Sequence, residues 1–170
     1  SGGGRIPIFC DTTSCTHTLL FETGGDILTP ENREKYKQLK IMDITQWLKE
    51  VVLPRIKVIR PKNRILLHPT CSCQIMGLTP VLLDIARKCA REVILPDNWG
   101  CCGASGDRGF IFPELSDSAT RDERDEIGHE SFDGCYSLAR TCEIAMQDHI
   151  EQPYESIVYL VDETIQDQGT

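Results

Sequence analysis

Nine cysteines in a chain of 170 residues are the side chains with the greatest capacity for chemistry. Five of them follow segments that we expect to be β-strands: Cys15, Cys71, Cys73, Cys101 and Cys102. Ligand sites of open parallel sheets form just beyond the carboxyl ends of the strands. Thiolates at such an edge are ligands for zinc and for iron–sulfur clusters. The spacing therefore predicts a metal or redox site assembled from the cysteines of several strand ends.

The alternative use of a cysteine is hydrophobic packing, because free cysteine is among the most buried residue types. We assign Cys101 and Cys102 to the site, because a glycine on each side of the pair lets the backbone turn tightly and bring both sulfurs to one centre. A disulfide between these two neighbours is an alternative. The other assignments are Cys71, Cys142 and Cys15 as metal ligands, Cys73 as an open case, Cys10 and Cys89 as core residues, and Cys135 as a loop residue without a role.

Two further features stand beside the cysteines. Gly103, Gly106 and Gly109 recur at regular spacing, with Arg108 among them. Such a segment can form a nest of backbone N–H groups, in which Gly103 and Arg108 would bind an anionic group of a cofactor. The interpretation we favour is a tight loop that shapes the cysteine site. His68 precedes a proline at a strand end and is either part of the site or a structural residue.

The elements that must position these residues follow from hydrophobic periodicity. Arg64–His68 is a continuous apolar run that predicts a strand buried on both faces. Thr79 is expected to cap a helix with Pro80 at its first position, and Glu92–Pro96 is the next strand. Strand, helix and strand in this order make a βαβ unit. We therefore predict an α/β fold with a small, mostly parallel sheet flanked by helices and with the cysteines clustered at one sheet edge.

The rest of the chain supplies the flanking elements. Asp43 can cap the second of two helices within Glu31–Val52. The charged stretch Arg121–Glu126 indicates a solvated helix face, and no internal repeat is strong enough to assign from the sequence alone. Further strands are expected at Ile6–Cys10, Arg55–Arg60 and Ser156–Val161, and further helices at Ser118–Ile127 and Ser137–His149.

Composition narrows the class of protein. Hydrophobic residues make up 40% and charged residues 26% of the chain, as in an ordinary globular protein. The net charge of −8 argues against nucleic acid and against an anionic membrane surface as partners. No apolar run approaches the roughly 20 residues of a transmembrane segment. Residues 1–4 read as a cloning scar or linker, so we expect one domain over residues 5–170. The odd number of cysteines and the absence of a secretory signal favour a cytoplasmic location.

Three motifs in the chain resemble those of the cysteine-rich CCG domain: His68-Pro69-Thr70-Cys71, Cys101-Cys102-Gly103 and Arg140-Thr141-Cys142. That domain occurs in heterodisulfide reductase, in the iron–sulfur subunit of glycolate oxidase, and at the C-terminus of FAD-linked D-2-hydroxyacid dehydrogenases. In this family a cysteine after a strand is followed by CCG and then by CxxC. Here Cys101 follows Cys71 by 30 positions, and Cys142 follows Cys102 by 40.

The stretch 101–110, CCGASGDRGF, is most similar to the branch that contains D-lactate and D-2-hydroxyglutarate dehydrogenases. Residues 11–19 resemble the last cysteine motif of a preceding half-repeat. The chain departs from the family pattern because Ala139 stands where CxxC would have its first cysteine. The second half then supplies four thiolates, from Cys71, Cys101, Cys102 and Cys142, which is enough for either a [4Fe–4S] cluster or zinc.

The resemblance implies an electron-transfer module of a flavin-dependent D-2-hydroxyacid dehydrogenase. FAD in another domain of the parent protein would oxidise the hydroxyacid, and electrons would pass through iron–sulfur centres to an acceptor. The implied partners are the FAD-binding and ferredoxin-like domains of the parent, which would be cytoplasmic or peripheral to the membrane. The chain contains no flavin motif, so no catalytic residue is assigned in it. Two alternatives remain open: a structural zinc or thiol docking domain, and a thiol–disulfide redox site at Cys101 and Cys102.

Overall fold

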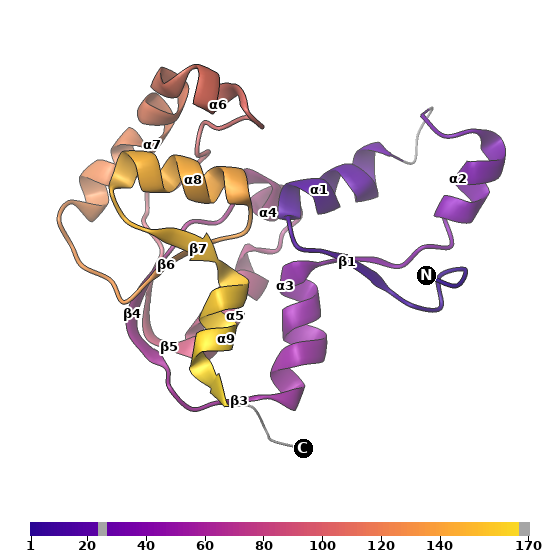
Figure 1. Ribbon diagram of the computed structural model, residues 1–170, viewed down its shortest axis with the longest axis horizontal. Helices are drawn as coiled ribbons and strands as arrows, with labels where there is room; N and C mark the ends of the chain where they lie inside the picture. Colours follow the sequence, from indigo (N-terminus) through magenta and orange to yellow (C-terminus); the bar gives the residue numbers. More distant parts are fainter. Residues whose placement is uncertain (24–26, 167–170) are drawn as a thin grey trace.

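The computed structural model describes residues 1–23 and 27–166. Within these residues the main sheet has four parallel strands in the order β5-β4-β6-β7 (Figure 1), formed by Ala90–Ile94, Lys62–Leu67, Cys135–Ser137 and Tyr154–Ser156. Two smaller pairs are the parallel β1 (Ile8–Cys10) with β2 (Ile41–Asp43), and the antiparallel β3 (Lys57–Val58) with β8 (Ile165–Gln166). Parallel strands alternate with helices along the chain, so the predicted α/β fold is confirmed.

Helices fill most of the remaining chain. Their bounds are α1 Thr13–His17, α2 Pro30–Tyr36, α3 Ile44–Trp47, α4 Cys71–Ile75, α5 Thr79–Cys89, α6 Arg108–Ile111, α7 Pro113–Ile127, α8 Arg140–Ile150 and α9 Ile157–Thr164. Wider turns prolong α1 over Thr18–Glu22 and α3 over Leu48–Val52, and a 3₁₀ turn follows at Leu53–Arg55. In residues 1–23 and 27–166 no helix combines the length and the apolar character needed to cross a membrane.

The strand β4 is buried on both faces, as its continuous apolar run predicts. Ile65 and Leu67 pack in a core cluster with residues of α3, α5 and α9. Leu66 belongs to a second cluster with residues of α7 and α8. None of the three side chains has exposed surface. Because β4 is followed by α4, α5 and the parallel strand β5, the βαβ unit expected from the sequence is confirmed.

The strand predicted at Ser156–Val161 is wrong, because this segment is the start of helix α9. The Ser156 hydroxyl accepts a hydrogen bond from the N–H of Val158 at 3.4 Å and so caps the helix. The run has β propensity, but its buried residues recur at the helical period and pack in the core beside α5. Those buried residues are Ile157, Leu160, Val161 and Thr164.

Two smaller expectations also differ from the structure. Cys135 does not lie in a loop but begins β6, where it is 2% exposed. Thr79 is the first residue of α5 rather than its cap, since Leu78 occupies the cap position and makes no side-chain capping bond. Pro80 does stand in the first turn of α5, where its missing N–H removes no helical hydrogen bond.

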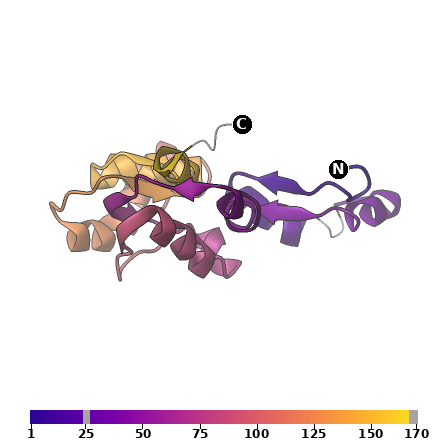
Figure 2. The same ribbon diagram turned by 90° about the horizontal axis from the view of Figure 1, so that it is seen from below.

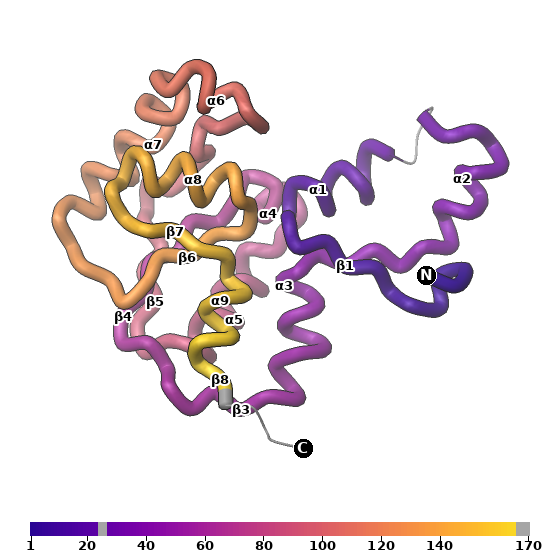
Figure 3. Tube along the Cα trace, in the orientation of Figure 1, coloured from indigo at the N-terminus to yellow at the C-terminus, as the bar shows by residue number. Residues whose placement is uncertain are grey.

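The fold contains an internal repeat, and the resemblance of residues 11–19 to a half-repeat motif is its one sign in the sequence. The segment β1–α1 matches β6–α8, because in both the helix begins three residues after the strand ends. The segment β2–α3 matches β7–α9, and the pairing registers agree: Ile8 pairs with Ile41 as Cys135 pairs with Tyr154. In the first copy, β1, β2 and α1 lie toward the arm at the indigo end of the chain (Figures 2 and 3), whereas α3 packs on the main core. The antiparallel pair β3–β8 joins the segments that follow α3 and α9.

The predicted N-terminal cap of α3 at Asp43 is confirmed. The fully buried Asp43 carboxylate accepts hydrogen bonds from the Thr45 N–H at 2.9 Å and hydroxyl at 2.7 Å. The Gln46 side chain accepts one from the Asp43 N–H at 3.1 Å. We expect Asp43→Ala to lower the free energy of unfolding by about 1–2 kcal/mol in urea denaturation. Asp43→Asn keeps an acceptor oxygen and should lose less, so equal losses would contradict the capping role.

Candidate metal centre

Three adjacent strands of the main sheet carry cysteines just beyond their carboxyl ends. Cys71 is the first residue of α4 and follows β4. Cys101 and Cys102 follow β5, and Cys142 lies in the first turn of α8 after β6. Since β5, β4 and β6 are parallel neighbours, these ends meet at one edge of the sheet. The predicted edge with cysteines from three strand ends is present, but its third strand is β6 and not the expected first strand, β1.

The four thiols at this edge form a continuous chain of contacts. The Sγ atoms of Cys102 and Cys142 lie 2.9 Å apart. Cys101 lies between Cys102 and Cys71, close enough that each of these neighbours influences the pKa of its thiol. Cys102 and Cys142 are buried, whereas Cys71 and Cys101 are exposed. The site therefore has an inner pair shielded from water and an outer pair that meets the surface.

The loop that holds the cysteine pair depends on glycine. Gly103 has a φ of +73°, and a Cβ built on it would lie 2.6 Å from the carbonyl oxygen of Leu115 and from the Cα of Ser116. The Gly103 N–H donates to Cys101 Sγ at 3.4 Å. Gly103 thus lets the loop pack directly on α7, as expected of a tight loop that shapes the site. Arg108 is exposed at the start of α6, and anion binding by Gly103 and Arg108 stays a prediction.

The surroundings of these thiols favour the protonated form. Burial and then the neighbouring Cys101 raise the pKa of Cys71. The contact with Cys102 and then burial raise the pKa of Cys101 well above its usual range. For Cys102 the neighbouring Cys101 lowers the pKa, but the contact with Cys142 and burial outweigh this effect and raise the pKa to about 12. Activated cysteine nucleophiles have lowered pKa values, so these thiols are not activated and react only slowly at neutral pH.

A bound cation would reverse this preference, because metal ligation requires thiolates and displaces their protons. In the described ranges 1–23 and 27–166, no three Cys, His, Asp or Glu side chains are already spaced as ligands of one metal ion. Two thiolates on one tetrahedral zinc lie about 3.8 Å apart, given Zn–S bonds of about 2.3 Å. The Cys102 and Cys142 sulfurs would separate by about 1 Å to reach that spacing. With this opening, the four thiols fit zinc or a [4Fe–4S] cluster in type and number.

Cys15, the fifth predicted ligand, lies exposed in α1. Burial and then the adjacent Cys10 raise the pKa of its thiol. Among the described contacts, those that join the other four thiols do not include Cys15. Cys15 is the third residue of α1 as Cys142 is the third residue of α8. The internal repeat therefore explains why the two cysteines look alike in the sequence.

Three of the other cysteines are packing residues, whereas Cys10, which was expected in the core, is half-buried in β1 and belongs to neither core cluster. Cys73 and Cys89 have no exposed surface and lie in the core cluster on the α5 side of the sheet. Burial raises the pKa of Cys73 to about 12. Cys135, which lies in the opposite core cluster, has its pKa raised to about 12 by burial alone. The open case of Cys73 is thus settled in favour of the core.

His68 has a structural partner that the sequence did not indicate. Its Nδ1 lies 2.9 Å from Oε2 of Glu123, and both residues are 1% exposed. Arg121–Glu126 was expected to be a solvated face, which is wrong for Glu123. The available signal was the spacing of Ser116, Thr120, Glu123 and Ile127, which marks a buried stripe along α7.

The polar cluster around this pair extends to Tyr154. Burial and then Glu123 raise the pKa of the Tyr154 hydroxyl. Within residues 1–23 and 27–166, His68 Nε2 and the Tyr154 hydroxyl are buried without a hydrogen-bond partner. The cluster ties the carboxyl end of β4 to α7, and so holds the strand end that leads to Cys71.

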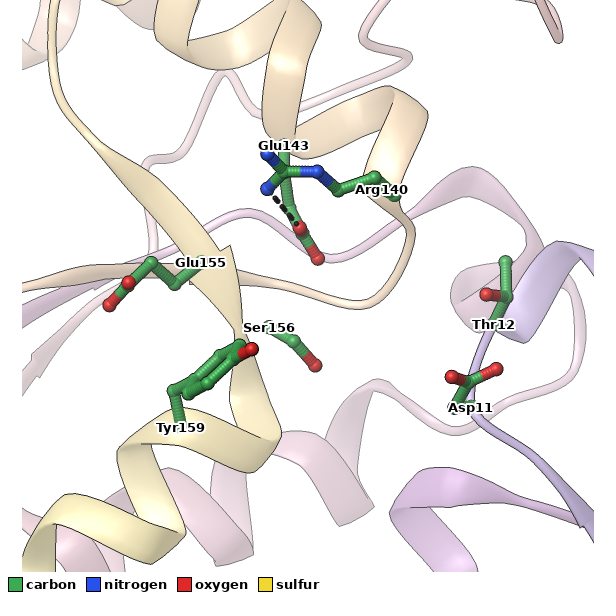
Figure 4. Close-up of a pocket in the computed structure, with 7 residues that line it drawn as sticks. All are labelled: Asp11, Thr12, Arg140, Glu143, Glu155, Ser156 and Tyr159. Atoms are coloured by element: carbon green, nitrogen blue, oxygen red, sulfur yellow. Dashed lines mark hydrogen bonds and ion pairs between the residues drawn. The ribbon is translucent and has the colours of Figure 1, made fainter.

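A cavity of about 400 Å³ lies beyond the carboxyl ends of β6, β7 and β1 (Figure 4). Arg140 donates to Glu143 at 3.1 Å. Glu143 is 4% exposed, and burial raises its pKa. The cavity is lined by three carboxylates, one guanidinium and three hydroxyl groups. This mixture does not indicate one class of ligand. The lining residues are Asp11, Thr12, Arg140, Glu143, Glu155, Ser156 and Tyr159.

Comparison with known proteins does not assign the chain to a family. No model of a known protein family matches the chain, and no curated protein matches it. The resemblance to the CCG domain therefore rests on the motifs themselves and stays a prediction.

Proposed function

We propose that this chain is an electron-transfer module that holds a metal centre through Cys71, Cys101, Cys102 and Cys142. The observation that carries the proposal is the chain of contacts among these four thiols at adjoining strand ends. A [4Fe–4S] cluster, when bound, supplies one-electron transfer. The residues of the chain supply the thiolates and shield the inner pair from water. The exposed Cys71 and Cys101 place the centre within reach of an electron-transfer partner.

The motifs around these cysteines support a more specific proposal. They resemble those of FAD-linked D-2-hydroxyacid dehydrogenases, of the D-lactate or D-2-hydroxyglutarate type. In such a parent protein, FAD in another domain oxidises the hydroxyacid, and FAD-binding and ferredoxin-like domains are the partners of this module. The chain alone then has no 2-hydroxyacid oxidation activity of its own.

Anaerobic reconstitution with ferrous iron and sulfide tests the electron-transfer function. We expect about four iron and four sulfide per chain, together with a broad visible absorption that dithionite bleaches. Electron paramagnetic resonance of the reduced sample should show a paramagnetic cluster. Reconstituted chain that contains no iron, or iron that does not take up electrons, would rule out an electron-transfer module.

A structural zinc site is the second candidate, and the spacing of the inner pair favours it. The Cys102 and Cys142 sulfurs, 2.9 Å apart, need to open only slightly to share one zinc ion, and further to bind different iron atoms of a cluster. Zinc titration should then give about one zinc per chain, no visible absorption and a raised melting temperature. A tighter and more stabilising complex with zinc than with the cluster would decide for the structural role.

A further inference from the structure

We propose that Cys102 and Cys142 form a disulfide when the chain carries no metal, and that this bridge controls whether the metal centre can be assembled. The first half of the proposal stands on the geometry of the two sulfurs alone. The second half rests on the proposed function. The Sγ atoms lie 2.9 Å apart, about 0.9 Å more than the length of a disulfide bond.

The structure selects this pair among the nine cysteines. Cys102 comes from the loop after β5 and Cys142 from the first turn of α8, so a bridge between them would join two separate elements and not two neighbours in the chain. The Cys101–Cys102 pair is different, because a bridge between adjacent residues closes a small strained ring. Cys73 and Cys89 lie in the core on the other face of the sheet, and Cys73 contacts the Thr79 hydroxyl at 3.9 Å.

Access to the inner pair runs through Cys101. Cys102 is 4% and Cys142 8% exposed, whereas Cys101 is exposed and contacts Cys102. A low-molecular-weight disulfide, such as oxidised glutathione, therefore meets Cys101 first. The Cys101 sulfur attacks it, forms a mixed disulfide and releases one thiol of the reagent.

Two internal exchanges complete the oxidation. The Cys102 sulfur attacks Cys101, which releases the second thiol of the reagent and leaves a strained bridge between the neighbours. The Cys142 sulfur then attacks Cys102 and returns Cys101 to the thiol. In total, Cys102 and Cys142 lose two electrons and two protons, and the reagent disulfide is reduced to two thiols.

The bridge removes half of the thiolates on which the proposed centre depends. Only Cys71 and Cys101 then remain free to bind a metal, and two ligands hold zinc or a cluster much less tightly than four. A metal that binds first has the opposite effect, because both sulfurs are engaged and no longer meet each other. Metal loading and oxidation of this pair therefore exclude one another.

Alkylation and mass spectrometry of the metal-free chain test the bridge. After incubation with oxidised glutathione, two fewer of the nine cysteines should take up iodoacetamide. Peptide mapping should place the bridge between the segments that contain Cys102 and Cys142. Cys101→Ser removes the ambiguity between the neighbours, and it should keep the bridge but form it at least about tenfold more slowly. Undiminished labelling, or a bridge that maps to another pair, would overturn the proposal.

Metal loading of the oxidised and reduced chains tests the consequence. Reduced chain should bind zinc, or iron with sulfide, whereas oxidised chain should bind less than about a tenth as much until dithiothreitol is added. If the oxidised and reduced chains bound equal amounts of metal, the disulfide would not control assembly of the centre, although the metal centre itself would still be supported. The bridge could map to Cys102 and Cys142 while the reduced chain binds no metal. That result would support the disulfide, but it would refute both the metal centre and the control of its assembly by the disulfide.

Discussion

Glu123→Ala is expected to lower the free energy of unfolding by about 3–5 kcal/mol. Glu123 and His68 are each 1% exposed and lie 2.9 Å apart between α7 and the end of β4. Removing the carboxylate leaves the imidazole buried without its hydrogen-bond partner. Urea denaturation monitored by circular dichroism measures the loss.

An exposed ion pair of the same chain provides the control. Lys35 Nζ lies 2.6 Å from Glu31 Oε1, but the two side chains are 67% and 79% exposed. Glu31→Ala should leave the free energy of unfolding nearly unchanged, because an exposed pair is screened by water and salt. If Glu123→Ala were as harmless as Glu31→Ala, the buried pair would not be what holds β4 to α7. Replacing both His68 and Glu123 with apolar residues of similar volume should recover much of the loss.

The sequence predicts best where long apolar runs or turn chemistry determine the local structure. The run before His68 requires a strand buried on both faces, and Asp43 caps a helix as its side-chain chemistry predicts. Strands β6 and β7 have three residues each and no alternating pattern of their own. They exist because β4 offers a hydrogen-bonding edge to β6, and β6 offers one to β7. Tertiary pairing of this kind leaves no signal in a short stretch of sequence.

The internal repeat leaves little trace in the sequence beyond the motif at residues 11–19, for a related reason. Between α1 and β2 the first copy inserts a wider turn and helix α2, whereas in the second copy α8 is followed almost at once by β7. The features that the two copies share are therefore a matched pairing register, the position of a cysteine in the first helix and a capped second helix.

The position of cysteines at strand ends predicted three of the four thiols that lie together. Cys142 was predicted from the motif resemblance alone, because the strand that precedes it was not recognised. Glu123 was missed because charged residues surround it on both sides in α7.

Serine substitutions at single cysteines are expected to separate metal binding from folding. Cys101 is exposed, so Cys101→Ser should change the stability of the metal-free chain very little. It removes one of four thiolates, however, and should weaken metal binding at least about tenfold. Cys71→Ser is expected to behave in the same way.

Cys135→Ser should give the opposite result. Cys135 is 2% exposed in β6, and a serine there buries a hydroxyl group in an apolar core. The metal-free chain should lose about 1–3 kcal/mol of unfolding free energy, while the metal content after loading stays unchanged. Cys89→Ala on the other face of the sheet should lose about 1 kcal/mol through lost packing and also keep its metal.

Cys15→Ser decides whether the first copy of the repeat contributes a ligand. The contacts of the Cys15 thiol are with Cys10, so the variant should load metal as well as the unaltered chain. The measurements are metal stoichiometry after anaerobic loading and urea denaturation of the metal-free chain, made on every variant. Loss of metal in step with loss of stability across the series would mean that the metal reports only on folding. We expect Cys101→Ser to lose metal but keep its stability, and Cys135→Ser to lose stability but keep its metal. This pair of results is possible only if metal binding depends on the Cys101 thiol itself. It would place the metal centre at the edge where β5, β4 and β6 end.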